Sequence, residues 1–143
     1  MQVAADSLLG AWRLVEWSVE TTSTGRMAWP FGKNATGLLI YEPGGWMSAT
    51  LSQRERTRLS APSVRQADER SRAQVATEYL AYGGRWSLEG TCVVHDVSLS
   101  LNPTLLDTRQ IREVSFVDGD LVLAATETDG GSERVHRLRW RRP

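Results

Sequence analysis

The chain has one cysteine and no long apolar run. A single cysteine, Cys92, excludes an internal disulfide and is typical of a reducing compartment. No stretch approaches the ~20 consecutive apolar residues of a membrane-spanning helix. Residues 1–9 lack both the basic start and the apolar run of a signal peptide. We therefore expect a cytoplasmic protein that does not associate with a membrane.

The chain also lacks an excess of charge of either sign. Its 17 basic and 17 acidic residues give a formal net charge of zero, which offers no electrostatic reason to expect a nucleic-acid partner. GxSxG, GxGxxG and P-loop motifs are absent, so a hydrolase elbow, a dinucleotide site and a phosphate cradle have no support. We predict no cofactor.

Metal ligands are equally scarce. A metal site usually needs three or four side-chain ligands, whereas the chain has His95, His136 and Cys92. These residues lie on separate predicted strands or, for Cys92 and His95, on opposite faces of one strand. We predict no metal site, and no haem-binding pattern accompanies His136.

Short segments in which apolar and polar residues alternate make up most of the chain. With 143 residues and 41% hydrophobic side chains, residues 1–143 suit one domain that buries roughly two-thirds of its unfolded surface. Alternation with Val and Trp enriched predicts strands. The eight predicted strands are Ala11–Thr22, Thr36–Tyr41, Trp46–Leu51, Arg85–Leu88, Thr91–Leu101, Arg109–Val117, Asp120–Thr126 and Glu133–Trp140.

One helix is predicted over Ser63–Tyr82, between the third and fourth strands. Ser63 and Gln66 have the spacing of a capping box, and Gly83-Gly84 would end the helix. Its first half is polar, so we expect it to lie outside the strands, where it could cover one end of them. Eight antiparallel strands joined in sequence order can close into a barrel, which removes both sheet edges and just admits a small ligand.

Several segments carry a family resemblance. Gly10-Ala11-Trp12 opens the first strand with a Gly-x-Trp, and residues 29–49 read WPFGKNATGLLIYEPGGWMSA. Together with YGGRW at residues 82–86 and a histidine-bearing strand followed by Asn102-Pro103, they resemble the bacterial lipocalin-like domain family. Asp107 stands where the resemblance leads us to expect glycine.

The resemblance implies a calycin-type barrel with a central cavity. The expected fold is therefore an all-β, eight-stranded antiparallel up-and-down lipocalin-like barrel with one helix between strands 3 and 4. The resemblance implies no single activity, because fold and function separate easily, although members often sit among genes for specialised metabolites.

The resemblance also implies that Trp12 closes one end of the barrel and that an arginine of the last strand stacks on it. Arg137, Arg139 and Arg141 are candidates, and distance from the chain end favours Arg139. Such a cation–π contact contributes about 1 kcal/mol. A Trp12 that touches ligand is the alternative.

Three residues are candidate catalytic groups. One face of the strand Thr91–Leu101 is apolar except for His95, which predicts an inward imidazole that could act as acid or base. The resemblance favours an inward Arg112, which could bind a carboxylate or polarise a carbonyl. Tyr82 could present its phenol inside or at the rim. A core histidine with satisfied hydrogen bonds, a solvated arginine and a packing tyrosine are the structural alternatives.

The candidate ligand-binding residues are mostly apolar or aromatic: Tyr41, Trp46, Met47, Trp86, Val97, Leu99 and Glu16. Glu16 would face inward together with Trp12 and Leu14. The opposite face of that strand is also apolar and carries Val15, Trp17 and Val19. Those residues would pack under the helix or at the surface of a homodimer, or the facing of the strand is reversed.

Two functions fit these residues. In the first, the barrel binds a hydrophobic, partly oxygenated small molecule, such as a polyketide- or terpenoid-like metabolite. In the second, it is a cofactor-independent cyclase or isomerase, in which the cavity folds such a molecule and His95, Arg112 and Tyr82 transfer protons or polarise a carbonyl. A filled interior would instead indicate a structural or interaction protein.

Overall fold

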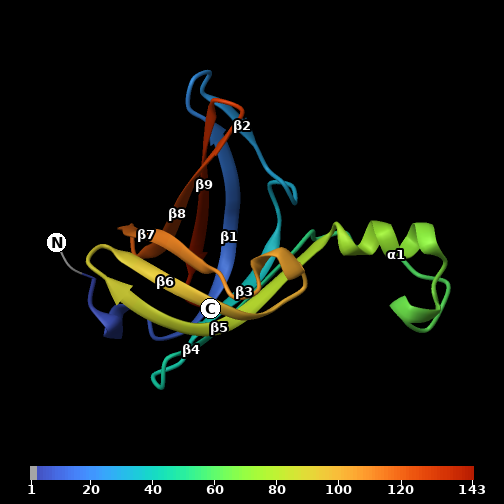
Figure 1. Cartoon of the computed structure of the whole chain (residues 1–143), viewed down its shortest axis with the longest axis horizontal. Helices are drawn as coiled ribbons and strands as arrows, with labels where there is room; N and C mark the ends of the chain where they lie inside the picture. Colours follow the sequence, from blue (N-terminus) through green and yellow to red (C-terminus); the bar gives the residue numbers. More distant parts are fainter. Residues whose placement is uncertain (1–2) are drawn as a thin grey trace.

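The strands form one closed antiparallel sheet (Figure 1). The computed structural model describes residues 3–143. The strands are β1 (Gly10–Thr21), β2 (Arg26–Ala28), β3 (Thr36–Tyr41), β4 (Trp46–Ser52), β5 (Tyr79–Glu89), β6 (Cys92–Ser100), β7 (Arg109–Val117), β8 (Asp120–Asp129) and β9 (Ser132–Arg141). β1 pairs with β3, each later strand pairs with the next, and β9 returns to β1. The predicted eight-stranded antiparallel barrel is confirmed.

The short strand β2 lies outside this circuit. It pairs only with the last residues of β1, and its side chains are exposed. The sequence pattern did not reveal β2, because so short a segment shows no recognisable alternation. The helix, α1 (Glu69–Ala76), lies between β4 and β5. Its predicted position between strands 3 and 4 is wrong, because the prediction did not count β2.

Helix α1 is also shorter than the predicted Ser63–Tyr82. It begins after Asp68, whose Oδ1 accepts a hydrogen bond from the backbone N–H of Ser71 at 2.9 Å. Residues 79–82 belong to β5, because they pair there with β4. Cross-strand pairing therefore overrides the local helix pattern. Figure 1 shows α1 extending away from the barrel, so it does not cover the mouth.

Three 3-10 turns complete the described secondary structure: η1 (Ala5–Ser7), η2 (Val64–Gln66) and η3 (Pro103–Leu105). Asn102 caps η3 by accepting the N–H of Thr104 at 3.0 Å. Asp107, just beyond η3, has a φ of 62°. This left-handed region favours glycine, and aspartate tolerates it better than most residues. The loop thus adopts a glycine-like backbone without a glycine.

One buried carboxylate ties the segment that carries α1 to the barrel. Glu78 is 2% exposed and accepts hydrogen bonds from the backbone and hydroxyl of Thr57, and from Gln74 and Arg56. The Thr57 bonds are the main cause that lowers the pKa of Glu78 to about 2. The ionised carboxylate holds this segment at the start of β5.

A β-bulge in β1 decides which of its side chains face the interior. The pairing of β1 with β9 shifts between Leu14 and Glu16, which leaves one extra residue in β1. Before the bulge Trp12 is buried inside the barrel, and after it Trp17 lines the interior. The prediction that Glu16 faces inward is therefore wrong. Glu16 instead accepts a hydrogen bond from Trp29 Nε1 at 3.0 Å.

The bulge also turns inward two residues, Trp17 and Val19, that the alternation pattern allowed at the surface of a homodimer. Trp17 packs edge-on against Phe31, with ring centroids 5.0 Å apart, and Val19 is 8% exposed. Because the extra residue turns these side chains inward, they are not available as an outer contact surface.

The closed end of the barrel is filled around Trp12. Its ring is 2% exposed and its Nε1 donates to the carbonyl of Leu8 at 2.9 Å. The arginine that covers the ring is Arg142, with its guanidinium carbon 3.7 Å from the ring centroid. The prediction of Arg139 was wrong. Arg13 pairs with Arg141 in antiparallel register, so Arg142 comes opposite Trp12.

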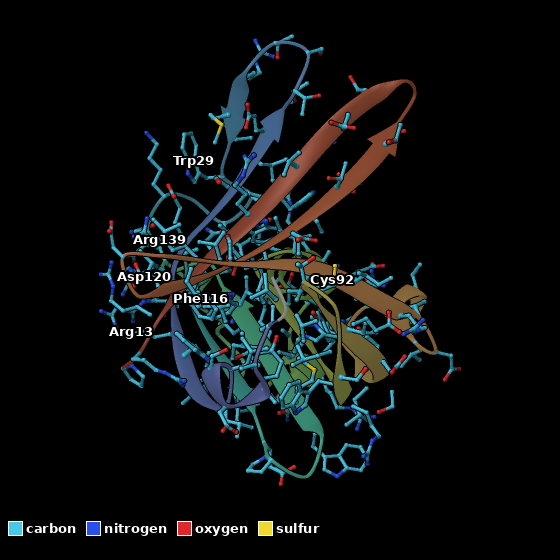
Figure 2. The ribbon with its side chains drawn as sticks, turned by 90° about the vertical axis from the view of Figure 1, so that its left-hand side faces the viewer. Arg13, Trp29, Cys92, Phe116, Asp120 and Arg139 are labelled. Carbon is cyan, nitrogen blue, oxygen red and sulfur yellow. The ribbon has the colours of Figure 1, made fainter. Side chains whose placement is uncertain are left out.

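Arg139 belongs to a separate charge cluster. Its Nε is 2.7 Å from Asp120 Oδ2, and Arg141 contacts the same carboxylate at 2.8 Å. Figure 2 shows Arg139 and Asp120 close together on the outside of the strands. Hydrogen bonds from Arg141 and Arg139 lower the pKa of Asp120 to about 2.

Candidate ligand-binding site

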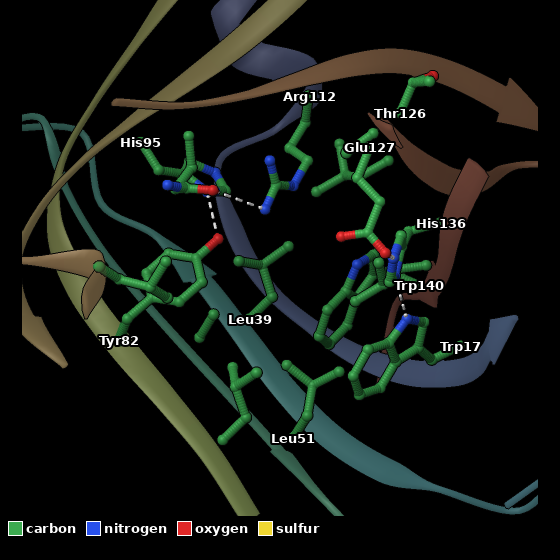
Figure 3. A pocket seen from close by; sticks show the side chains of 17 residues that line it. Trp17, Leu39, Leu51, Tyr82, His95, Arg112, Thr126, Glu127, His136 and Trp140 are labelled. Carbon is green, nitrogen blue, oxygen red and sulfur yellow. Dashed lines mark hydrogen bonds and ion pairs between the residues drawn. The ribbon is translucent and has the colours of Figure 1, made fainter. Parts of the chain in front are cut away.

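The half of the barrel above this base contains a cavity of about 370 Å³ (Figure 3). Its apolar lining residues are Trp17, Leu39, Ala49, Leu51, Leu80, Leu105, Leu123, Ala125, Leu138 and Trp140. Its polar lining residues are Tyr82, His95, Gln110, Arg112, Thr126, Glu127 and His136. The cavity therefore has an apolar wall with a small number of polar groups, which is the usual composition of a small-molecule site.

His95 reaches the cavity from β6 on the same face as Val93 and Val97, although Val94 on the other face is buried as well. Val93, His95 and Val97 are 0%, 1% and 3% exposed, whereas Asp96 between the last two faces solvent. β6 pairs with β5 on one side and β7 on the other, and these strands carry Tyr82 and Arg112. Three neighbouring strands thus bring the three predicted catalytic candidates to one cavity.

Both ring nitrogens of His95 contact tyrosine hydroxyls. Tyr41 Oη lies 2.7 Å from Nε2 and Tyr82 Oη lies 2.7 Å from Nδ1. A neutral imidazole carries one N–H, so one tyrosine donates and the other accepts. We call Tyr41, His95 and Tyr82 the Tyr–His–Tyr chain.

The burial of Tyr41 decides the direction of these hydrogen bonds. Tyr41 is 1% exposed, and His95 is its only hydrogen-bond partner among the described residues. If Tyr41 accepted from His95, its own proton would be buried without an acceptor, at a cost of about 1–3 kcal/mol. Tyr41 therefore donates to Nε2, and the Nδ1–H of His95 donates to Tyr82.

This direction leaves the hydroxyl proton of Tyr82 free for the cavity. A hydroxyl that accepts one hydrogen bond becomes a stronger donor of the next. Arg112 supplies further donors beside it (Figure 3). Its guanidinium donates to the carbonyl of Ile111 at 3.0 Å and to Gln110 Oε1 at 3.4 Å, and it forms no ion pair with a carboxylate in residues 3–143.

The Tyr–His–Tyr chain is uncharged near neutral pH. Burial, and to a smaller extent the charge of Arg112, lowers the pKa of His95 to about 3. Burial also raises the pKa of Tyr82, and it raises the pKa of Tyr41 well above its ordinary value. The positive charge on this wall therefore belongs to Arg112 alone, and the wall offers hydrogen-bond donors to a ligand.

A second polar group lies across the cavity on β1, β8 and β9. Trp17 Nε1 donates to His136 Nδ1 at 3.2 Å, and His136 Nε2 lies 3.1 Å from Glu127 Oε1. Because an indole N–H only donates, Nδ1 must be unprotonated, and His136 carries its proton on Nε2. His136 then donates to Glu127. We call Glu127 and His136 the acid–imidazole pair.

None of the seven residues predicted to bind the ligand, Trp86 included, lines this cavity. Tyr41 lies behind His95, and its ring packs on Trp86 with centroids 4.9 Å apart. Met47 and Val97 are buried in the barrel interior but do not line the cavity. Of these residues, Tyr41 supports the wall from behind through its contact with His95.

Two of the predicted ligand-binding residues lie on the outer surface. Trp46 is 52% exposed, since it alternates with the buried Met47, and the guanidinium of Arg85 covers its ring at 4.5 Å. Leu99 is 72% exposed. A bulge between β5 and β6 pairs Gly83 with Leu99 but Gly84 with Val97, which breaks the alternation that predicted an inward Leu99.

Sequence reasoning missed the far wall of the cavity. Trp17, Glu127 and His136 were not candidates for ligand contact, because their facing depends on the β1 bulge and on the pairing of β8 with β9. The hairpin turn at Gly130 and Gly131 was recognisable and could have indicated that Glu127 and His136 lie near each other.

The described residues contain no cluster suited to a metal ion. No group of three or more His, Cys, Asp or Glu side chains is placed to hold one in residues 3–143. None of the helices in the described part of the chain is long and apolar enough to cross a membrane.

The fold and the cavity define a class: a small closed antiparallel barrel with an internal cavity. The profile of the lipocalin-like domain family matches residues 9–143. The chain therefore belongs to that family, and the resemblance noted in the sequence is confirmed. No curated protein and no solved structure matches the chain.

Proposed function

We propose that the cavity binds a small, mainly apolar molecule that carries a hydrogen-bond-accepting oxygen. The observation that supports this most is the convergence of the Tyr82 hydroxyl and the Arg112 guanidinium in a cavity with apolar walls. Arg112 has no carboxylate partner in the described part of the chain, and a ligand carbonyl or carboxylate would supply one.

The size of the cavity limits the ligand. Its volume of about 370 Å³ lies at the lower end of the ~300–1,000 Å³ range of ligand sites. A skeleton of one or two rings suits this space. Polyketide- and terpenoid-like metabolites include such compact skeletons with carbonyl and hydroxyl oxygens, and we propose this class as the ligand.

A second candidate function is a cofactor-independent cyclase or isomerase. It is favoured by one observation: His95, Tyr82 and Arg112 share the same cavity. The Tyr–His–Tyr chain ends at Tyr41, whose pKa is raised well above its ordinary value, so full proton donation along it would leave a buried phenolate. Polarisation of a carbonyl by Tyr82 and Arg112, with restriction of the substrate, is the chemistry that these groups favour.

The test of binding is titration calorimetry with 1-tetralone, a bicyclic ketone. We expect saturable binding that weakens about two- to tenfold in Tyr82→Phe, because the variant loses one hydrogen bond to the carbonyl. Tyr79→Phe is the matched control, since Tyr79 lies on the same strand but does not line the cavity. Absence of binding, or equal losses in both variants, would contradict the proposed site.

Ligand capture separates the binder from the enzyme. The pure protein is incubated with an extract of the host, and the bound small molecules are recovered and compared with the extract. Recovery of unchanged molecules, with undiminished affinity in His95→Ala, would argue against catalysis by His95. Recovery of a molecule altered only by the protein with His95 intact would favour the cyclase or isomerase.

A further inference from the structure

The cavity has polar groups of opposite character on two of its walls (Figure 3). The first wall, on β5 and β7, holds Tyr82 and Arg112, and the second, on β8 and β9, holds Glu127 and His136. Because β7 pairs with β8, Arg112 and Glu127 lie on neighbouring strands, whereas Leu39 lies between Tyr82 and Glu127. The first wall donates hydrogen bonds and carries a positive charge. The second wall carries the carboxylate of Glu127.

The Glu127 side chain is 53% exposed, so its carboxylate is open to solvent as well as to the cavity. His136 and Arg134 both approach Glu127 through Oε1, at 3.1 and 3.9 Å. The second oxygen, Oε2, has no hydrogen-bond partner among residues 3–143. A carboxylate oxygen has room for further hydrogen bonds, so Glu127 can accept one from a ligand while it keeps His136 in place.

Arg112 and Glu127 line one cavity but do not pair with each other. No ion pair joins them within 4.0 Å in the described structure. Opposite charges that face a shared space without contact favour a molecule that bridges them. Trp140 lines the same cavity, and its buried Nε1 has no hydrogen-bond partner among the described residues. This N–H is therefore the one buried polar side-chain group of the lining that the described residues leave unsatisfied.

We propose that the ligand is polar at both ends. A carbonyl oxygen accepts from Tyr82 and Arg112, and a hydroxyl at the opposite end of an apolar skeleton donates to Glu127. This inference rests on the proposed function, since it assigns the far end of the same ligand. The proposed ligand class is then narrower than an oxygenated apolar molecule. It is a ketone or carboxylic acid with an added hydroxyl, and the two oxygen groups lie at different ends of the apolar skeleton.

The test compares three ketones that share one skeleton: 1-tetralone, 6-hydroxy-1-tetralone and 6-methoxy-1-tetralone. The hydroxyl can donate to Glu127, whereas the methoxy group cannot. We expect the hydroxy ketone to bind about tenfold more tightly than 1-tetralone, as for a hydrogen bond to a charged acceptor. The methoxy ketone should bind no more tightly than 1-tetralone.

The variant Glu127→Gln should remove most of this tenfold preference for the hydroxy ketone over 1-tetralone. Glu133→Gln is the matched control, because Glu133 is an exposed carboxylate of the same hairpin outside the cavity. Equal binding of all three ketones, or a preference that survives Glu127→Gln, would overturn the two-ended ligand and leave the proposed function standing. No binding of any of the three would overturn both.

Discussion

The two halves of this barrel use the same strands for different purposes. In the base, Trp12 and Leu121 are almost fully buried, and Asp120 is paired with two arginines. In the cavity half, Arg112 has no carboxylate partner among the described residues, and Trp140 Nε1 has no hydrogen-bond partner there. The base satisfies its own groups and supports the fold, whereas the cavity leaves groups for a ligand. Such local departures from complete packing are expected at functional sites.

The largest expected effect compares two leucines. Leu121→Ala in the filled base should lower the free energy of unfolding by about 3 kcal/mol, since it opens a cavity among packed side chains. Leu51→Ala at the cavity wall should lower it by about half as much, because Leu51 already borders empty space. Urea unfolding measures both. Equal losses would contradict the division into a packed base and an open half.

Acid should affect the two halves over different ranges of pH. The folded pKa of His95, about 3, lies below the ~6.5 of an unfolded histidine. The unfolded chain therefore binds the proton first, and stability should fall by up to about 1.4 kcal/mol per pH unit as the pH drops from about 6.5 to about 3. Asp120 has a lowered pKa of about 2, so its contribution is lost between about pH 4 and pH 2.

Variants should separate these two ranges. His95→Gln should flatten the dependence between pH 6.5 and 4, since glutamine does not titrate. Asp120→Asn should lower the stability above about pH 4, where the paired carboxylate contributes, and should flatten the pH dependence only between about pH 4 and pH 2. Unfolding free energies measured at fixed pH values test both. A wild-type stability that stays constant from pH 6.5 to 4 would contradict a His95 buried in its neutral form.

The smallest expected effect concerns the arginine over Trp12. A double-mutant cycle of Arg142→Gln with Trp12→Leu should give a coupling energy of about 0.5–1 kcal/mol, as for a cation–π contact whose guanidinium is exposed to solvent. The same cycle with Arg139→Gln should give none, because Arg139 binds Asp120. Coupling to Arg139 instead would contradict the pairing register at the base.

Alternation in the sequence was sufficient to predict the eight strands of the barrel, though not β2 or the first part of β5, and the inward His95. It failed at Glu16 and Leu99, where bulges insert an extra residue. A bulge is visible only in the pairing with a distant strand, so no local pattern could have revealed it. The helix prediction failed at its C-terminal end for a related reason, since Tyr79 and the next residues pair with β4.

By itself the sequence determined the strand periodicity, most of the turns and the barrel class, because these depend on neighbours along the chain. The tertiary structure alone decided that Arg142 covers Trp12, that Tyr41 orients His95 toward Tyr82, and that Glu127 and Arg112 line one cavity. In each of these arrangements the residues lie apart in sequence and come together only in the fold. They depend on register, bulges and hydrogen-bond direction, which only closure of the sheet sets.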